Sequence, residues 1–374
     1  MTEPTPEPSA EPEPSAGPES APEPESESRP AATPGSVTGP GAPEPTEPTE
    51  PTEPTEPTEA TAPGPLVIVG PTASGKSALA LALAGRLDRP CEIVSADAMA
   101  VYRGMDVGTA KPTPTERAEV PHHLVDVADP SEEYTVARFQ EEATAVLAEV
   151  EGRGAIPIVV GGTGLYVRAV VDAFTMPGQF PEARARVEAE PSLDVLWQEL
   201  QRLDPDAAAK ILPSNRRRIE RALEVTIGSG RPFSGFGPGL DQYPPTRFRQ
   251  IGLRLARDEI DRRIEARYHA QVAEGFLDEV DALAALAADP DGPRLSRTAG
   301  QALGYREFLA HRAGESTFDE AFDLACKRTR RFARRQERWF RRDPRITWFD
   351  ATSTELADRV ERWWRYSLVG GDDR

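Results

Sequence analysis

The chain has 374 residues, a formal net charge of −18 and two cysteines. Most of the charge lies in residues 1–64, which hold 14 Glu and one basic residue, so residues 65–374 carry only −5 and the acidic composition says little about their partners. No apolar run reaches the ~18 residues that a membrane-spanning helix needs. The two Cys and four His show no metal-ligand spacing, which argues against a zinc site and fits a cytoplasmic protein.

The first 64 residues are expected to form a disordered tail rich in Pro and Glu. They contain 18 of the 38 Pro, and Pro-Thr-Glu repeats five times from Pro45 to Glu59. So few apolar side chains cannot form a core. The absence of a basic start and an apolar run excludes a secretory signal. A solvated spacer is favoured over an interaction tail.

The next segment contains a phosphate-binding loop. Residues 70–77 read Gly-Pro-Thr-Ala-Ser-Gly-Lys-Ser, which fits G-x-x-x-x-G-K-[ST]. An apolar run precedes the loop and an Ala- and Leu-rich run follows it, as in a strand, loop and helix. Backbone N–H groups of the loop would surround phosphate oxygens at the positive end of the helix. The residues expected to bind are Gly70, Thr72, Ala73, Ser74, Gly75, Lys76 and Ser77, with Ser77 as the ligand of Mg²⁺.

Residues 65–175 alternate between strand and helix patterns and are predicted to form the P-loop catalytic core. Such alternation predicts an α/β fold with a parallel sheet and helices on both faces. The expected strands are 66–69, 92–95, 124–127 and 156–160, and the expected helices are 75–87, 134–151 and 164–171. Ligands of parallel sheets bind at the carboxyl ends of the strands.

The rest of the chain is predicted to be largely helical. Residues 176–246 are expected to form a helical insertion, and residues 247–374 to complete the core and add Arg-rich C-terminal helices. The expected elements are helices at 181–190, 193–203 and 215–227, a strand at 248–255, and helices within 258–287, 298–311 and 318–342.

Two polar residues follow expected strands of the core. Asp97 comes after the second strand, where a carboxylate beside bound phosphate suits a general base or a Mg²⁺ ligand, with a turn or helix cap as the alternative. Thr163 lies between glycines after the strand at 156–160 and is a weaker candidate, because Gly-Gly-Thr is also a common turn.

Basic residues gather at three places outside the core. Residues 327–345 hold ten Lys and Arg against two acids, and we expect Phe332, Trp339 and Phe340 to pack inward while most of the Arg face a polyanion, most simply nucleic acid. A second cluster, Arg216 to Arg218 with Arg221, lies in the helical insertion. Arg263 and Arg267 share one helix face, where binding of pyrophosphate or RNA phosphate and surface ion pairing are equally open.

Several segments together resemble the bacterial tRNA dimethylallyltransferase family, also called tRNA isopentenyltransferases, over nearly all of residues 65–350. Besides the phosphate loop, they are Tyr-Arg-Gly-Met-Asp-Val-Gly-Thr-Ala-Lys (102–111), Pro-His-His-Leu-Val-Asp (121–126), Val-Gly-Gly-Thr-Gly-Leu-Tyr (160–166), Arg-Ala-Leu-Glu-Val (221–225), Ala-Leu-Gly-Tyr (302–305) and Phe-Ala-Arg-Arg-Gln (332–336).

The resemblance implies transfer of a dimethylallyl group from its diphosphate to N6 of an adenosine next to the tRNA anticodon, with Mg²⁺ as the cofactor. Asp97 then corresponds to the general base, while Thr163, Lys76 and Arg267 act at the diphosphate. The residues that fall where the family contacts tRNA are Arg184, Arg217, Arg218, Arg221, Gln301, Tyr305, Arg334, Arg335 and Gln336. The protein is expected to act as a monomer and to have no membrane as a partner.

The chain departs from the family pattern at a few positions. The residues after Asp97 are Ala98, Met99 and Ala100, where the family usually has Ser, a variable residue and Gln, and Arg338 replaces a small hydroxyl residue. An active enzyme is expected, with altered positioning of the target base or altered tRNA choice. Two alternatives stay open: a P-loop phosphotransferase that acts on a small molecule, and a non-catalytic, nucleotide-gated RNA-binding protein.

Overall fold

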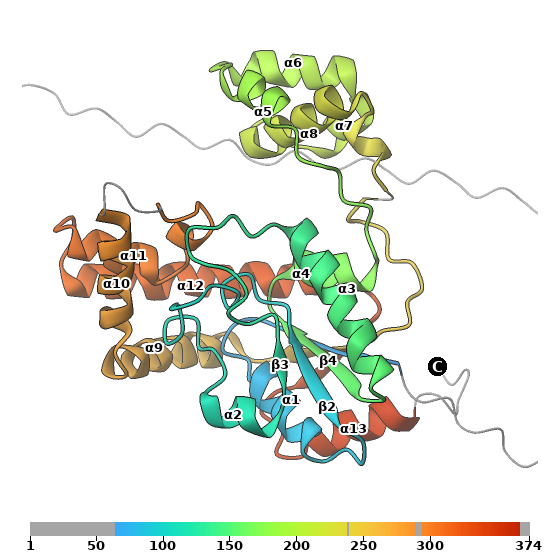
Figure 1. Ribbon diagram of the computed structural model, residues 1–374, viewed down its shortest axis with the longest axis vertical. Coiled ribbons are helices and arrows are strands. Elements are labelled where there is room, and N and C mark those ends of the chain that lie inside the picture. Colours follow the sequence, from blue (N-terminus) through green and yellow to red (C-terminus); the bar gives the residue numbers. More distant parts are fainter. Residues whose placement is uncertain (1–63, 238, 289–293, 367–374) are drawn as a thin grey trace, which may run out of the picture. The chain divides into compact units, whose positions relative to one another are not determined.

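The computed structural model describes residues 64–237, 239–288 and 294–366 (Figure 1). All of them belong to one unit of the chain, which spans residues 59–374. The predicted disordered tail lies outside the described residues, except for Gly64. No helix of the described residues is long and apolar enough to cross a membrane.

A six-stranded, fully parallel sheet forms the centre of the fold, which confirms the predicted fold class. Its strand order is β3-β2-β4-β1-β5-β6. The strands are β1 (Leu66–Val69), β2 (Cys91–Ser95), β3 (His122–His123), β4 (Ile156–Gly161), β5 (Arg249–Arg254) and β6 (Ile346–Asp350). Because β1 lies between β4 and β5, the segment that carries the phosphate loop is central in the sheet.

Both faces of the sheet are covered by helices, and alternate residues of β1 show how. Leu66 and Ile68 pack into a cluster with α1 and α13, whereas Val67 and Val69 pack into a larger cluster with α3, α4 and α12 (Figure 1). Side chains of successive strand residues point to opposite faces, so an unbroken apolar strand requires cover on both sides. The helices are α1 (Lys76–Ala84), α3 (Val136–Gly152), α4 (Gly164–Val171), α12 (Phe318–Phe340) and α13 (Leu356–Tyr366).

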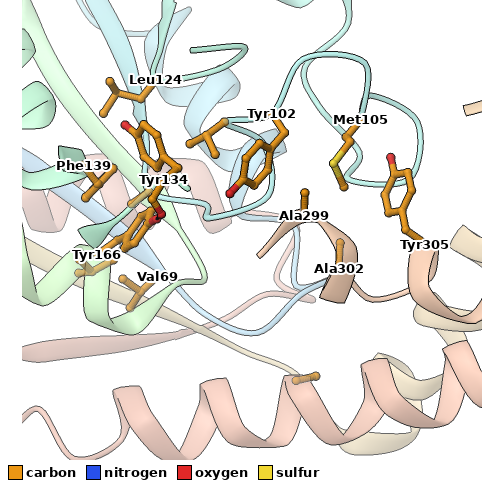
Figure 2. Packing of buried hydrophobic residues seen from close by; sticks show 14 of the residues in the cluster. Val69, Tyr102, Met105, Leu124, Tyr134, Phe139, Tyr166, Ala299, Ala302 and Tyr305 are labelled. Carbon is orange, nitrogen blue, oxygen red and sulfur yellow. Dashed lines mark hydrogen bonds between the residues drawn. The ribbon is translucent and has the colours of Figure 1, made fainter. Parts of the chain in front are cut away.

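The larger cluster is rich in aromatic side chains, several of which are drawn in Figure 2. Phe139 of α3 stacks on Tyr166 of α4 with ring centroids 4.1 Å apart. Tyr102 and Tyr305 are fully buried in the same cluster. The cluster therefore joins the sheet to helices that come from both halves of the chain.

The helical insertion has an apolar cluster of its own. Leu196, Leu200, Ile219 and Leu223 are fully buried together. Its helices are α5 (Pro181–Glu188), α6 (Leu193–Leu203), α7 (Pro205–Lys210) and α8 (Arg216–Ser229), followed by the short 3-10 helix η1 (Phe233–Gly235). This segment can thus bury apolar surface without help from the sheet.

The remaining helices lie between β5 and β6 in the sequence or precede β3. They are α2 (Pro114–Glu119), α9 (Arg257–Ala273), α10 (Phe276–Ala288), the 3-10 helix η2 (Ala299–Gln301) and α11 (Tyr305–Arg312). The helical stretch predicted over 258–287 is two helices, separated at Gly275, whose φ of 98° lies in the left-handed region.

One predicted strand is wrong. Residues 124–127 do not form a strand, because Leu124 and Asp126 adopt φ of 60° and 59°, and the strand of this region is the preceding pair His122–His123. Asp126 accepts hydrogen bonds from Lys111 at 2.5 Å and from Arg117 at 2.7 Å. These ion pairs hold an apolar, strand-like segment in a compact turn. The sequence reading also missed α2, α7, β6 and α13.

Helix α12 packs closely against the turn that follows β4. A Cβ atom added at Gly164 would overlap the indole ring of Trp339, and one added at Gly162 would overlap the side-chain amide of Gln336. Both positions therefore require glycine because the helix approaches so closely. Neither glycine has a φ in the left-handed region, so backbone conformation is not the reason. The two residues of α12 fix the distance between this helix and the turn.

The change Gly164→Ala should destabilise the protein by about 1–3 kcal/mol, because the new methyl group displaces the Trp339 ring from a packed core. Thermal and urea unfolding would measure the loss. Gly85→Ala is the matched control, since the nearest atom to its added Cβ is the Leu81 carbonyl oxygen at 3.8 Å. Equal unfolding curves for Gly164→Ala and Gly85→Ala would contradict the proposed close packing.

Candidate active site

Three strand ends bring the predicted catalytic residues to one edge of the sheet. Val69 of β1 is in register with Gly161 of β4, and Ser95 of β2 is in register with Val160. Because the strands are parallel and adjacent, the turns that follow them lie side by side. Those turns hold the phosphate loop, Thr163 and Asp97. All three line one cavity of about 1230 Å³.

The phosphate loop has a strained backbone and an unpartnered hydroxyl group. Gly75 caps α1 with φ of 91°, and Ala73 adopts φ of 62°, a conformation that costs a non-glycine residue energy. The Ser74 hydroxyl oxygen is buried and has no hydrogen-bond partner within the described part of the chain. A buried polar atom of this kind in a loop at a helix N-terminus is ready to bind an anion.

Lys76 is the main positive charge of the loop. Its ammonium group donates to the Pro71 carbonyl oxygen at 2.7 Å. Burial lowers the pKa of Lys76 from 10.5 to about 8, with Arg267 lowering it further and Asp97 raising it. A phosphate group bound nearby would favour the charged form, so the site is electrostatically incomplete without an anion.

The side chains of Asp97 and Thr163 both hold the turn that follows β2, by accepting hydrogen bonds from its backbone N–H groups. One oxygen of the Asp97 carboxylate accepts from Met99 N at 2.8 Å and from Ala100 N at 3.4 Å. The Thr163 hydroxyl oxygen accepts from Ala98 N at 3.0 Å. Asp97 therefore caps a turn, as the alternative interpretation proposed, while its second carboxylate oxygen makes no hydrogen bond within the described residues. The Thr163 hydroxyl proton is still free to donate.

Arg267 of α9 reaches the same cavity, and Arg263 does not. The Arg267 guanidinium donates to the Thr72 hydroxyl at 3.0 Å, which ties α9 to the phosphate loop. Arg263 pairs instead with Glu259 at 2.5 Å and is not among the cavity-lining residues. Of the two interpretations left open for this pair, phosphate binding fits Arg267 and surface ion pairing fits Arg263.

The site offers oxygen ligands that suit Mg²⁺ and lacks a larger ligand cluster. Ser77 is exposed at the start of α1 and lines the cavity, and the described residues contain no group of three or more His, Cys, Asp or Glu that could hold a metal. Mg²⁺ is commonly bound by few protein oxygens together with phosphate oxygens and water. The exposed Ser77 hydroxyl fits an ion that arrives with its phosphate ligand.

The arginines of the insertion and of α12 differ in whether they line the cavity and in whether they are paired with other residues. Three of them, Arg184, Arg217 and Arg335, line the cavity. Arg184 pairs with Glu188, and the guanidinium of Arg335 lies over the Phe332 ring. Arg217 has no partner among the described residues. Arg218 is exposed but does not line the cavity, and Arg221 is committed to Glu224 and to two carbonyl oxygens.

The prediction for the aromatic face of α12 needs one correction. Phe340 is buried and Trp339 packs against the core, as expected, but Phe332 lies half-buried in the cavity wall. Acids of other elements also oppose the basic face, because Arg334 pairs with Asp261 at 3.3 Å and Arg330 with Glu265 at 2.6 Å. The sequence count of two opposing acids missed these partners.

Two residues predicted to contact tRNA are placed elsewhere by the structure. Tyr305 is fully buried, and its hydroxyl donates to Glu279 at 2.6 Å. Gln336 is buried, and its side-chain amide forms hydrogen bonds with the backbone of Thr72 and Gly162 beneath the cavity. Neither side chain is at the surface. Gln301, predicted with them, is exposed and lines the cavity.

Sequence reasoning also missed the carboxylate that holds one wall of the cavity. Glu279 of α10 accepts from the backbone N–H groups of Asp106, Val107 and Gly108 at 2.8, 2.6 and 3.1 Å. Residues 108–112, which follow, line the cavity. Glu279 lies more than 160 residues away in the sequence, so no local pattern could reveal this contact.

Comparisons with known proteins agree with this geometry. The family model described as IPP transferase matches residues 100–343. The chain is 52% identical to the tRNA dimethylallyltransferase of Kineococcus radiotolerans over 79% of this chain and 95% of that protein, and 48% identical to that of Thermobifida fusca over 79% and 92%.

Two solved structures are similar in fold. The full-length tRNA isopentenylpyrophosphate transferase of Bacillus halodurans gives a TM-score of 0.58 at 38% identity, covering 81% of this chain and 95% of that chain. A eukaryotic dimethylallyltransferase acting on tRNA gives 0.64 at 26% identity, covering 82% and 77%. On the family model that matches residues 100–343 and on these relatives, the chain belongs to the IPP transferase family.

Proposed function

We propose that the protein transfers a dimethylallyl group from dimethylallyl diphosphate to N6 of the adenosine next to the anticodon in tRNA, with release of diphosphate. Membership of the family makes the chain a prenyltransferase that acts on tRNA. The observation that carries the finer proposal is that one cavity is lined by Lys76, Arg267, Asp97 and Thr163 together with arginines of the insertion and of α12. Anion binding, proton removal and RNA contact are thus combined in one place.

The phosphate loop would hold the diphosphate of the donor. Loop amides, Lys76 and Arg267 would surround its oxygens, which gain charge as the bond to the allylic carbon breaks. The Thr163 hydroxyl can donate to an oxygen of the same group, because Ala98 N occupies only its acceptor side. Mg²⁺ held by Ser77 and the phosphate oxygens would supply further stabilisation of that charge.

Asp97 would act as the general base on the adenine amine. The N6 lone pair forms the new bond to the allylic carbon, the electron pair of the carbon–oxygen bond leaves with diphosphate, and the N6 proton passes to Asp97. The first carboxylate oxygen holds the turn through Met99 N and Ala100 N, so the second is left for this transfer. The target base must leave its stack to reach such a cavity.

Exposed basic residues would bind the tRNA backbone around the cavity. Arg335 and Arg217 line it, and Gln301 adds an amide. A second, smaller cavity of about 400 Å³ on α12 is lined by Lys327, Arg330, Arg331, Arg334 and Asp323. Its position extends the positive surface along the helix. A tRNA substrate and two unpaired, buried cysteines suit action in the cytoplasm. We also propose that the protein acts as a monomer.

The direct test combines the purified protein, dimethylallyl diphosphate, Mg²⁺ and unmodified tRNA, followed by mass spectrometry of the nucleosides. The proposal expects an adenosine that carries one dimethylallyl group, formed without ATP. Consumption of ATP without any need for tRNA would support a small-molecule phosphotransferase instead. Binding of tRNA with no product under any condition would point to a non-catalytic RNA-binding protein.

The variant Asp97→Asn should lower kcat by about 10²–10⁴-fold, because an amide cannot take the N6 proton. The amide oxygen can still accept from Met99 N, so the turn and the affinity for dimethylallyl diphosphate should be nearly unchanged. Single-turnover rates and donor titrations would separate the two effects. A kcat close to that of the parent protein would rule out Asp97 as the base.

Donor affinity should fall with rising pH because of Lys76. The pKa of about 8 means that the ammonium group is charged at pH 7 and largely neutral at pH 9. Since the bound diphosphate favours the charged form, the affinity should drop by up to about tenfold over this range. Calorimetric titration with dimethylallyl diphosphate, without tRNA, would measure it. Lys76→Arg keeps its charge at both values, so a parallel decline in that variant would contradict the assignment.

Charge on α12 should contribute to the salt dependence of tRNA binding. Replacing Arg335 with Gln removes one phosphate contact, so the slope of log affinity against log salt should become shallower by about 0.7–0.9. Arg86→Gln removes the same charge from a residue paired with Asp358 and Glu361 on the opposite side of the sheet. That control should keep the slope of the parent protein. Equal slopes for both variants would show that Arg335 makes no phosphate contact with the tRNA.

A further inference from the structure

A glutamine interrupts the apolar stripe of α12. The buried positions of this helix recur at intervals of three and four residues, and they are Ala321, Phe322, Ala325, Cys326, Thr329, Ala333, Gln336 and Phe340. Gln336 is only 6% exposed. A primary amide is costly at such a position unless both of its ends are hydrogen-bonded, so its presence calls for specific partners.

Both ends of the Gln336 amide bond to backbone groups of the active site. Its oxygen accepts from Thr72 N in the phosphate loop at 2.8 Å. Its nitrogen donates to the Gly162 carbonyl oxygen, directly before Thr163, at 2.9 Å. The side chain therefore bridges the turn after β1 and the turn after β4. These partners also fix which end of the amide is oxygen, because one partner can only donate and the other can only accept.

The bridge is part of a longer series of hydrogen bonds. Arg267 donates to the Thr72 hydroxyl, and Thr163 accepts from Ala98 N beside Asp97. Gln336 is the link between these two contacts. Through it, the groups proposed to act on the diphosphate and the group proposed to accept the proton are tied into one connected frame.

We propose that Gln336 is a positioning residue that sets the distance between the phosphate loop and the turn that carries Thr163. The proposal rests on the proposed function and assigns Gln336 no contact with substrate. Thr72 N donates to Gln336, so this amide of the phosphate loop forms part of the bridge. Loss of the bridge would let the two turns move apart.

Such a movement matters for group transfer because the reacting atoms lie on both sides of the bridge. The leaving diphosphate is proposed to lie in the loop, and the attacking amine lies near Asp97 and Thr163. A displacement of about 1 Å between them is enough to lower a rate by about 10²-fold. Arg335, the neighbour of Gln336, lines the cavity, so the same helix turn that faces RNA also fixes the site.

Two variants at this position separate hydrogen bonding from packing. Gln336→Met keeps the length and approximate volume but leaves both backbone groups without partners. It should lower kcat at least tenfold and weaken binding of inorganic diphosphate, with tRNA affinity within about twofold of the parent. Single-turnover rates, diphosphate calorimetry and filter binding of tRNA would measure the three quantities.

Gln336→Glu provides a signature that a packing role would not give. A protonated carboxyl group has one acceptor and one donor, as the amide has, whereas the ionised form would face the Gly162 carbonyl oxygen with a negative charge. Burial and that carbonyl raise the pKa of a glutamic acid at this position. The rate relative to the parent, measured at each pH, should therefore recover at least threefold between pH 8 and pH 6.

Cys326→Ala is the control for packing. Cys326 is buried on the same stripe of α12 and is not among the residues that line the cavity. Its loss should reduce thermal stability while leaving kcat and diphosphate affinity unchanged. A kcat loss equal to that of Gln336→Met would overturn the proposal, because generic loosening of α12 would then explain both.

The proposal is also overturned if both Gln336 variants match the parent, if they weaken tRNA binding alone, or if Gln336→Glu is equally impaired at every pH. Failure of the proposed function gives a different result. A parent protein that binds diphosphate but never prenylates tRNA would refute that function. If Gln336 positions the loop, the diphosphate affinity of Gln336→Glu relative to that of the parent, measured at each pH, would still rise as the pH falls.

Discussion

The parallel pairing of β1, β4 and β2 is the constraint from which the site arises. Val69 lies opposite Gly161 and Ser95 opposite Val160, so three consecutive strand ends open onto the same edge. In an antiparallel arrangement, one of the three turns would lie at the far end of the sheet. Parallel pairing requires long crossover connections, and here these contribute α1 with its N-terminal loop, α3 and α4. The topology thus places the anion-binding loop and the carboxylate close together without any local contact in sequence.

This edge concentrates positive charge before any ligand is present. Lys76 is half-buried, and the pKa of its ammonium group is lowered by loss of solvent and, to a smaller extent, by the charge of Arg267. The Ser74 hydroxyl lacks a partner, and Ala73 has a strained backbone. Each feature costs stability in the free protein, as is common where a fold is arranged for binding. A bound anion would favour the charged form of Lys76 and give the Ser74 hydroxyl a partner. The apolar clusters on both faces of the sheet provide the stability that such a loop requires.

The sequence predicted the local features of this site well and the long-range ones poorly. β1, α4 and α6 match the structure to the residue, because each combines a clear apolar pattern with clear boundaries. The strand expected at 124–127 failed because ion pairs of Asp126 with Lys111 and Arg117, invisible to an apolar pattern, bend the backbone. Asp97 and Thr163 were found because they follow strands.

The burial of Gln336 and Tyr305 was missed for a related reason. Each has an exposed arginine beside it, Arg335 and Arg306, and a motif of four or five residues does not show which side chain faces inward. The helical periodicity of α12 decides which side chains face inward, because Gln336 falls three residues after Ala333 and four before Phe340 on the buried stripe. Only the structure shows that the inward amide meets Thr72 and Gly162.

The departures from the family pattern after Asp97 leave its carboxylate in place. Residues 98 to 100 contribute only backbone N–H groups to the hydrogen bonds of the turn, since Ala98 N donates to the Thr163 hydroxyl and the amides of Met99 and Ala100 donate to the Asp97 carboxylate. None of these bonds depends on the side chains at 98 to 100, and Ala100 is buried. Replacing the family's Ser and Gln by Ala therefore removes polar groups from the neighbourhood of the entering base without releasing Asp97. Any difference in tRNA choice would arise from what the base meets there, while proton removal would proceed as in the rest of the family.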